Sequence, residues 1–281
     1  MLIKRIGILY HPMVEATCAK ARELTQFLSS QGIDVWTCSA WETEKAIAGL
    51  DSTDLILTTG GDGTILRAAQ VALRHQTPIT GINMGNLGFL TELRADEALD
   101  KLPDLLSGKG WVDERMMLEA TLVAPDSNNY PPGIFYALND VVLARGAVAK
   151  LVQINTSVDD KPLTIYRADG VILATATGST GYSLAAGGPV IYPQSTDLLL
   201  VPIVSHLSWR HSLILPSYST VKLQLITTNQ ATLSIDGHTN IPVANGATII
   251  VKQSTQKTRF LRLYPKNNFF HILEEKLRGK K

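Results

Sequence analysis

The 281-residue sequence predicts an α/β domain with a parallel sheet, followed by an all-β domain. Over the first hundred residues, short apolar runs alternate with segments of helical spacing. Beyond Trp111 the runs become short, rich in Val, Ile, Leu and Thr, and separated by turn residues, as in all-β domains. A hydrophobic content of 45% and a charged content of 18% are typical of folded globular chains. Strands alternating with helices predict a parallel sheet with helices on its faces.

The first domain is expected to cover residues 1–112. Its expected strands are 3–10, 33–40, 54–59 and 78–83, and its expected helices are 15–32, 41–50, 64–76 and 95–108. Sheets of this kind bind ligands beyond the carboxyl ends of their strands. The segment GGDGT follows the third expected strand, so it falls at that edge.

The second domain is expected to cover residues 113–262. Its expected strands are 117–125, 135–144, 151–160, 161–170, 171–178, 212–216, 220–227, 231–237 and 247–253. The segment 263–281 contains a helical pattern, NNFFHILEEKLRG, which we expect to fold back on the first domain.

Charge and composition argue against several classes of protein. The formal net charge of +1 lacks the basic excess of general nucleic-acid or membrane-surface binders. The apolar run LLLVPIVSHL is about half as long as a membrane span needs. The N-terminus has no signal-peptide pattern, and Cys18 and Cys38 are too few for a disulfide framework. We therefore expect a cytoplasmic protein without nucleic-acid or membrane partners.

The stretch from Gly60 to Thr64 places one carboxylate among three glycines, where a strand gives way to a helix. Such residues form tight turns, but glycines also let backbone N–H groups approach phosphate oxygens. We expect Thr64 to cap a helix that starts at Ile65, and Asp62 to be able to accept a proton. The stretch is neither a Walker A loop nor GxGxxG, so neither common nucleotide motif explains it.

A second concentration of small and hydroxyl residues lies in RADGVILATATGSTGYSLAAGGP, residues 167–189. This segment is either a tight crossover loop of the β domain or a loop that meets a ligand. A third candidate, Asn139-Asp140, interrupts a strand pattern and is uninformative by itself, because such pairs are common in bulges and turns.

Together these segments resemble the NAD kinases, which phosphorylate the 2′-hydroxyl of the adenosine ribose of NAD. The resemblance covers most of the chain. It rests on GGDGTILRAA, GINMGNLGFLTEL, LNDVVL, RADGVILATATGSTGYSLAAGGP, SHLSWRHSLILP and SIDG. GGDGT alone also occurs in diacylglycerol and sphingosine kinases, whereas the 167–189 block is specific to NAD kinases.

The resemblance implies a Rossmann-like N-terminal domain, a C-terminal β-sandwich domain and an active site between them. It makes Asp62 the catalytic base that activates the 2′-hydroxyl. The residues that it implies for NAD binding are Asp62, Gly63, Arg67, Asn139, Asp140, Lys150, Arg167, Asp169, Thr177, Thr180, Gly181, Tyr182, Ser183, Leu184, Ala185 and His238. The residues that it implies for the phosphate loop are Gly60, Gly61, Gly63 and Thr64.

The sequence departs from the family pattern in ways that bear on substrate preference. Asp140 stands where relatives often carry glutamate, and Ala176 and Gly181 alter the usual TPTGSTAY. The sequence does not decide whether the acceptor is NAD or NADH, or whether the phosphoryl donor is ATP or polyphosphate. It also does not decide between a dimer and a tetramer. The expected cofactor is Mg²⁺ or another divalent cation carried with ATP, and the metal ligands are not assigned. The alternatives are a diacylglycerol-type lipid kinase and a non-catalytic NAD(H)-sensing module.

Overall fold

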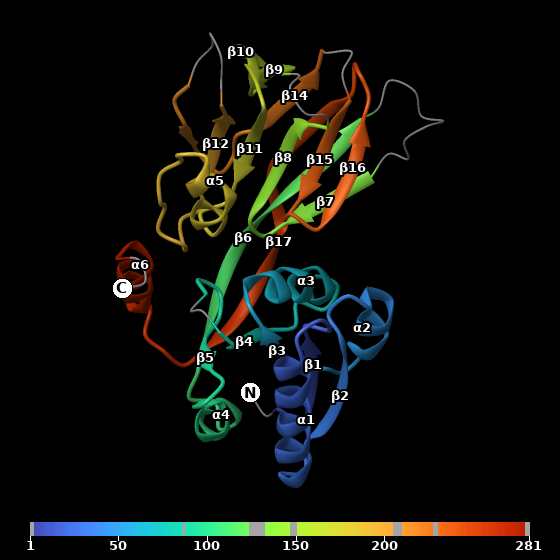
Figure 1. Ribbon diagram of the computed structural model, residues 1–281, viewed down its shortest axis with the longest axis vertical. Helices are drawn as coiled ribbons and strands as arrows, with labels where there is room; N and C mark the ends of the chain where they lie inside the picture. Colours follow the sequence, from blue (N-terminus) through green and yellow to red (C-terminus); the bar gives the residue numbers. More distant parts are fainter. Residues whose placement is uncertain are drawn as a thin grey trace. The chain divides into compact units, whose positions relative to one another are not determined.

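The computed structural model describes residues 3–85, 88–123, 133–146, 151–204, 210–226 and 230–278, and Figure 1 traces the chain. The chain divides into two compact units. The first unit consists of Met1–Glu114 and Thr258–Lys281, and the second of Arg115–Lys257. No helix in the described part of the chain is both long and apolar enough to cross a bilayer.

The first unit is built on a parallel sheet, as the alternation of strands and helices predicts. Its strands run in the order β2-β1-β3-β4, and β5 pairs with β4 in parallel. The bounds are Arg5–Tyr10 for β1, Asp34–Ser39 for β2, Leu55–Gly60 for β3, Ile79–Asn83 for β4 and Leu93–Arg94 for β5. Every residue of β3 and β4 is buried, as is common for the central strands of a parallel sheet with helices on both faces.

Helices cover this sheet. They are α1 (Glu15–Ser30), α2 (Thr43–Gly49), α3 (Asp62–Ala72) and α4 (Ala98–Leu106), and α6 (Asn268–Leu277) belongs to the same unit. The buried residues of α1 recur at helical spacing, and Leu24 and Leu28 pack in one cluster with Ile6 and Leu55 of the sheet. Helix α3 packs on β3 and β4.

The second unit is antiparallel throughout its described strand pairs. One sheet has six strands in the order β13-β12-β11-β8-β15-β16. In the other sheet, the neighbouring strands follow the order β10-β9-β14-β17, and β6 pairs with β7. The bounds are Trp111–Val123 for β6, Gly133–Ala137 for β7, Asp140–Arg145 for β8, Val152–Val158 for β9, Lys161–Ala168 for β10, Gly170–Ala174 for β11, Leu198–Ile203 for β12, Leu213–Leu215 for β13, Val221–Leu225 for β14, Ala231–Ile235 for β15, Thr239–Val243 for β16 and Thr248–Arg262 for β17.

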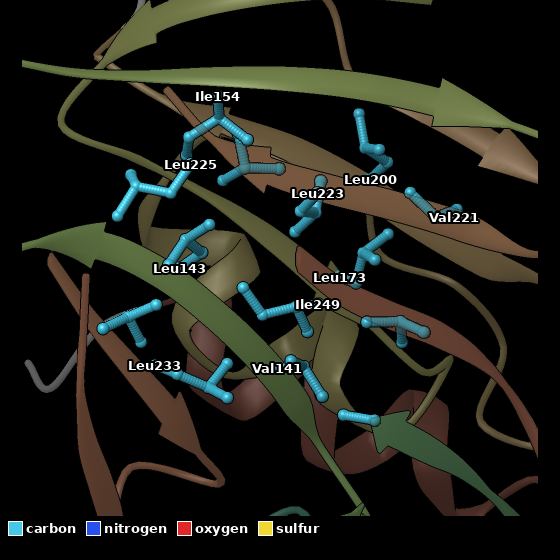
Figure 2. Packing of buried hydrophobic residues seen from close by; sticks show 14 of the residues in the cluster. Val141, Leu143, Ile154, Leu173, Leu200, Val221, Leu223, Leu225, Leu233 and Ile249 are labelled. Carbon is cyan, nitrogen blue, oxygen red and sulfur yellow. The ribbon is translucent and has the colours of Figure 1, made fainter. Parts of the chain in front are cut away.

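The main core of this unit lies where side chains of the two sheets meet. Figure 2 shows Leu143, Leu173 and Leu233 from the six-stranded sheet in one cluster with Ile154 and Leu223 from β9 and β14. The inward residues alternate along each strand with residues of the opposite face, as a β-sandwich requires. The β-sandwich expected from the resemblance is confirmed.

The outer face of the six-stranded sheet carries a second, smaller apolar cluster. Val142 and Ile172 project to this face and pack with Ala176 and Ile191. The segment that covers them contains a 3₁₀ turn, η1 (Gly178–Thr180), and the short helix α5 (Tyr182–Ala185). Within the hydroxyl-rich block, residues 170–174 therefore form strand β11 of this sheet, and the residues that follow cover part of its outer face.

Several strands differ from expectation. The expected strand 135–144 is interrupted at Leu138 and Asn139, which separate β7 from β8. Strands β5, β12 and β16 were not among the expected strands, and β17 extends well beyond the expected 247–253.

Candidate functional site

The glycine turn joins β3 to α3, but the helix starts earlier than expected. Helix α3 begins at Asp62, its N-cap is Gly61, and no side chain caps it. The prediction that Thr64 caps a helix starting at Ile65 is wrong. Thr64 lies inside the first turn, so close to Gly60 that a Cβ there would lie 2.3 Å from the Thr64 Oγ1. The start of the helix therefore presents N–H groups of its first turn without a capping side chain.

The Asp62 carboxylate is held by backbone groups of a neighbouring segment. Its Oδ2 accepts a hydrogen bond from the Phe89 N–H (2.9 Å), and its Oδ1 accepts one from the Leu90 N–H (3.1 Å). Gly88 allows this approach, because a Cβ at that residue would lie 2.1 Å from Asp62 Oδ1. The carboxylate is fixed in orientation while each oxygen keeps a further lone pair for another partner.

Arg67, expected to bind NAD, has an aromatic neighbour within its own unit. Its guanidinium carbon lies 4.2 Å from the centre of the Trp41 ring, a cation–π distance. Burial lowers the pKa of Arg67. The ring of His11 meets the same indole edge-on, with 4.5 Å between the ring centres.

In the second unit, one buried carboxylate fixes the corner between β7 and β8. Asp236 accepts backbone N–H groups from Leu138 (2.9 Å), Asn139 (2.7 Å) and Asp140 (3.0 Å). Burial raises the pKa of Asp236, whereas these N–H donors and His238 act in the opposite direction. The polar pair in the sequence is thus a corner that a distant aspartate stabilises.

Asp140 lies in an environment that disfavours its charged form. Burial and then the negative charge of Asp236 raise the pKa of Asp140 from 3.8 to about 7. The side chain therefore changes charge near neutral pH, and below that pH it can donate a hydrogen bond as well as accept one.

The 175–181 segment is built around the same corner. The Thr175 hydroxyl donates to the Leu138 carbonyl (2.6 Å), and the Thr175 N–H donates to the Asn139 carbonyl (2.9 Å). The Gly178 N–H donates to the Thr175 hydroxyl (3.0 Å), and a Cβ on Gly178 would lie 2.0 Å from the Asn139 carbonyl oxygen. This close approach requires glycine at position 178.

A cavity of about 440 Å³ opens beside this corner, on the outer face of the six-stranded sheet. The lining residues are Asn139, Asp140, Val142, Ala144, Tyr182, Thr232, Ser234, Asp236, Gly237 and Asn240. Val142 and Ala144 of β8 and Thr232 and Ser234 of β15 form one surface, since alternate residues of neighbouring strands share a face. The Asn139 Oδ1 is buried and has no hydrogen-bond partner among the described residues.

Of the residues expected to bind NAD, the structure brings Asn139, Asp140 and Tyr182 together at this cavity. Asp62, Gly63 and Arg67 lie in the other unit. The rest of the described expected residues do not line the cavity: Arg167, Asp169, Thr177, Thr180, Gly181, Ser183, Leu184, Ala185 and His238. Lys150 lies outside the described residues.

Of these residues, the side chains of Asp169 and Thr177 have polar partners, whereas that of Ser183 has none among the described residues. Asp169 forms an ion pair with Arg145 (2.8 Å). Buried Thr177 accepts a hydrogen bond from the Arg115 guanidinium (3.2 Å). The Ser183 hydroxyl is buried and finds no hydrogen-bond partner in the described part of the chain.

Asp236 is the residue that sequence reasoning misses, although SIDG contributes to the resemblance. Its hydrogen-bond partners lie 96 to 98 residues earlier in the chain, so no local pattern connects them. The sequence signal that could have found Asp236 is the Asp-Gly pair, which is typical of a tight turn. In the structure the backbone of Asp236 has a φ of 49°.

Within the described ranges, no three His, Cys, Asp or Glu side chains gather in a way that could hold a metal ion. A site that uses Mg²⁺ often needs no such cluster, because substrate phosphates and water supply most of the ligands of that ion.

Family comparison identifies both parts of the chain. Residues 42–109 match the ATP-NAD kinase N-terminal domain, and residues 138–263 match the ATP-NAD kinase C-terminal domain. The NAD kinase of Dehalococcoides mccartyi strain CBDB1 is 48% identical over 99% of this chain and 97% of its own length. The NAD kinase of Chloroflexus aggregans is 38% identical over 99% of both chains.

A solved structure has the same fold. The crystal structure of yeast NADH kinase complexed with NADH superposes with a TM-score of 0.86, at 26% sequence identity, over 100% of this chain and 89% of that chain.

Proposed function

This chain belongs to the ATP-NAD kinase family, and we propose that it transfers the γ-phosphoryl group of ATP to the 2′-hydroxyl of the adenosine ribose of NAD, giving NADP and ADP. The observation that carries the proposal is the Asp62 carboxylate, oriented by the N–H groups of Phe89 and Leu90 at the start of α3. Neither the lipid-kinase alternative nor the sensing alternative finds support in the comparisons.

Asp62 is the general base of the proposed reaction. It takes the proton from the 2′-hydroxyl as that oxygen forms a bond to the γ-phosphorus, and the bond from the γ-phosphorus to the bridging oxygen of ATP breaks. A positioned base of this kind contributes about 10²–10⁴-fold to the rate. The uncapped N–H groups at the start of α3 suit phosphate oxygens, since a helix N-terminus attracts anions.

The cavity of the second unit suits a nucleoside of NAD. It combines apolar surface from Val142 and Ala144 with the ring of Tyr182 and polar atoms of Asn139 and Asp140. Ligand sites commonly pair an apolar wall with a few polar groups that fix orientation. The Asn139 Oδ1, which has no partner among the described residues, is available to accept a hydrogen bond from the ligand.

A divalent cation, Mg²⁺ in the simplest case, would accompany ATP. The donor chemistry of the described residues fits an ion held by ATP phosphates and water, because they form no multi-residue cluster of ligands. When bound, the ion neutralises charge on the phosphates of the donor.

We further propose that the protein is a cytoplasmic homodimer or homotetramer. Cys18 and Cys38 are both free thiols, which suits a reducing compartment. The second unit exposes large apolar side chains, among them Ile134 (58%), Ile214 (57%) and Tyr218 (82%), which suit contact with another copy.

The test is NADP formation by the purified protein with NAD, ATP and Mg²⁺, detected by an NADP-specific dehydrogenase. Parallel reactions offer NADH or diacylglycerol as acceptor, and polyphosphate as donor. The proposal expects steady NADP production. Phosphorylation of diacylglycerol without NADP formation would show that the protein is a lipid kinase. Binding of NAD without phosphoryl transfer from any donor would favour the NAD(H)-sensing module.

A further inference from the structure

Arg262, the last residue of β17, is a buried cation that the reaction above does not use. Only 6% of the residue is exposed. The guanidinium lies 4.5 Å from the centre of the Phe260 ring. It faces two buried carboxylates, with its Nη1 3.1 Å from the Glu92 Oε2 and its Nε 3.4 Å from the Asp113 Oδ2. Removing a charged group from water is unfavourable, so close partners must compensate for the lost hydration.

The same guanidinium reaches the segment that holds Asp62. Nη1 of Arg262 donates to the Leu90 carbonyl at 2.8 Å and lies 3.4 Å from the Thr91 carbonyl. The N–H of Leu90 donates to the Asp62 carboxylate. Leu90 thus connects the two side chains, with Arg262 on its carbonyl and Asp62 on its amide.

Glu92 ties the two segments together from the other side. Its Oε1 accepts the N–H groups of Leu263 and Tyr264, both at 2.7 Å. Its own N–H donates to the Gly81 carbonyl of β4 at 2.8 Å. Residues 90–92 are therefore held between the end of β17 and the parallel sheet, which leaves the amides of Phe89 and Leu90 aimed at Asp62.

We propose that Arg262 is a positioning residue for the base Asp62, acting through residues 89–91. The role rests on the proposed function, because it assumes that Asp62 takes the proton. Arginine suits the task because its planar fork has five N–H donors, enough for a carbonyl and two carboxylates at once. Lysine keeps the charge but has a single nitrogen, so it cannot hold all of these partners in the same geometry.

Arg262→Lys is the first variant, and Arg259→Lys is its matched control. Arg259 lies on the same strand and pairs its Nε with Glu114 at 3.1 Å, but both side chains are exposed. Misplacing a reacting group by about 1 Å can cost 10²-fold, so Arg262→Lys is expected to lower kcat by about 10- to 100-fold while KM for NAD stays within about twofold. Arg259→Lys should leave both constants near the wild-type values.

A kinetic double-mutant cycle separates positioning from general damage. If Arg262 acts through Asp62, Arg262→Lys causes no further loss of kcat in a protein that already carries Asp62→Asn. An equal loss of kcat in both backgrounds would overturn the proposal.

Hydrogen exchange supplies a readout that does not depend on activity. In Arg262→Lys the amides of Phe89 and Leu90 should exchange about tenfold faster or more, while amides of β1 and β3 keep their wild-type rates. Unchanged exchange at Phe89 and Leu90 would overturn the positioning role of Arg262, whether or not the wild type makes NADP. Failure of the wild type to form NADP would instead overturn the proposed function and the catalytic role of Asp62, and would leave the exchange result to be judged separately.

Discussion

Gly178→Ala offers a direct test of how the cavity corner is built. The Cβ of the alanine would lie 2.0 Å from the Asn139 carbonyl oxygen and 2.5 Å from its carbonyl carbon. Ordinary contact begins at 3.4 Å, so the two backbone segments must separate by 3.4 − 2.0 = 1.4 Å. Both partners are backbone groups, and no side-chain rotation can relieve the clash.

The cost follows from what the separation breaks. The Thr175 N–H loses its hydrogen bond to the Asn139 carbonyl (2.9 Å), and a net hydrogen bond contributes about 0.5–1.5 kcal/mol. Overpacking a well-packed region costs about 1–3 kcal/mol. We therefore expect Gly178→Ala to lower the free energy of unfolding by roughly 2–4 kcal/mol. Affinity for NAD should also fall, because Asn139 lines the cavity.

The assay is urea unfolding, followed by calorimetric titration with NAD. Gly181→Ala is the matched control, since its Cβ would meet its nearest heavy atom, the Gly178 carbonyl oxygen, at 3.3 Å and needs only a small adjustment. If Gly178→Ala unfolded at the same urea concentration as Gly181→Ala and bound NAD as the wild type does, the steric reasoning would be refuted.

Three further predictions concern stability. Burial raises the pKa of Asp140 to about 7, so between pH 3.8 and about 7 the folded state holds a proton that the unfolded state has released. The free energy of unfolding should therefore fall as the pH rises from about 4 to 7, by at most about 4 kcal/mol. Urea unfolding of Asp140→Asn at several pH values should show a weaker dependence of this free energy on pH. Leu223→Ala should cost about 2–5 kcal/mol in the same urea assay, because Leu223 is fully buried in the sandwich core. Gly7→Ala should cost about 1–3 kcal/mol and alter tryptophan fluorescence, because its Cβ would lie 2.3 Å from the Trp36 ring; an unchanged spectrum would contradict it.

The first unit could be predicted well because its sheet is parallel and buried. Strand β3 is buried at every residue, so LILTTG is read as a strand without any knowledge of its partners. The start of α3 was predicted incorrectly because Thr64 is a good capping residue by type. Its hydroxyl instead packs against Gly60, a contact that local preference does not reveal.

The second unit was harder because its strands are short and their pairing is not local. Strand β16 (TNIPV) contains a proline, lacks an alternation of polar and apolar residues and follows a DG turn, so its sequence is typical of a loop. The cavity surface needs the register between β8 and β15, which places Ser234 opposite Val142. The role of Asp236 depends on backbone amides about a hundred residues away, which no motif encodes.

The central claim is that Asp62 acts as the base, and paired substitutions test it most directly. Asp54 is the matched control because its carboxylate also accepts two backbone N–H groups, from Lys4 (2.7 Å) and Arg5 (3.0 Å), in the same unit. The measurement is NADP formation and NAD affinity for Asp62→Asn and Asp54→Asn. We expect Asp62→Asn to bind NAD but lose about 10²–10⁴-fold in turnover, and Asp54→Asn to keep both. Near-normal turnover by Asp62→Asn would contradict the claim.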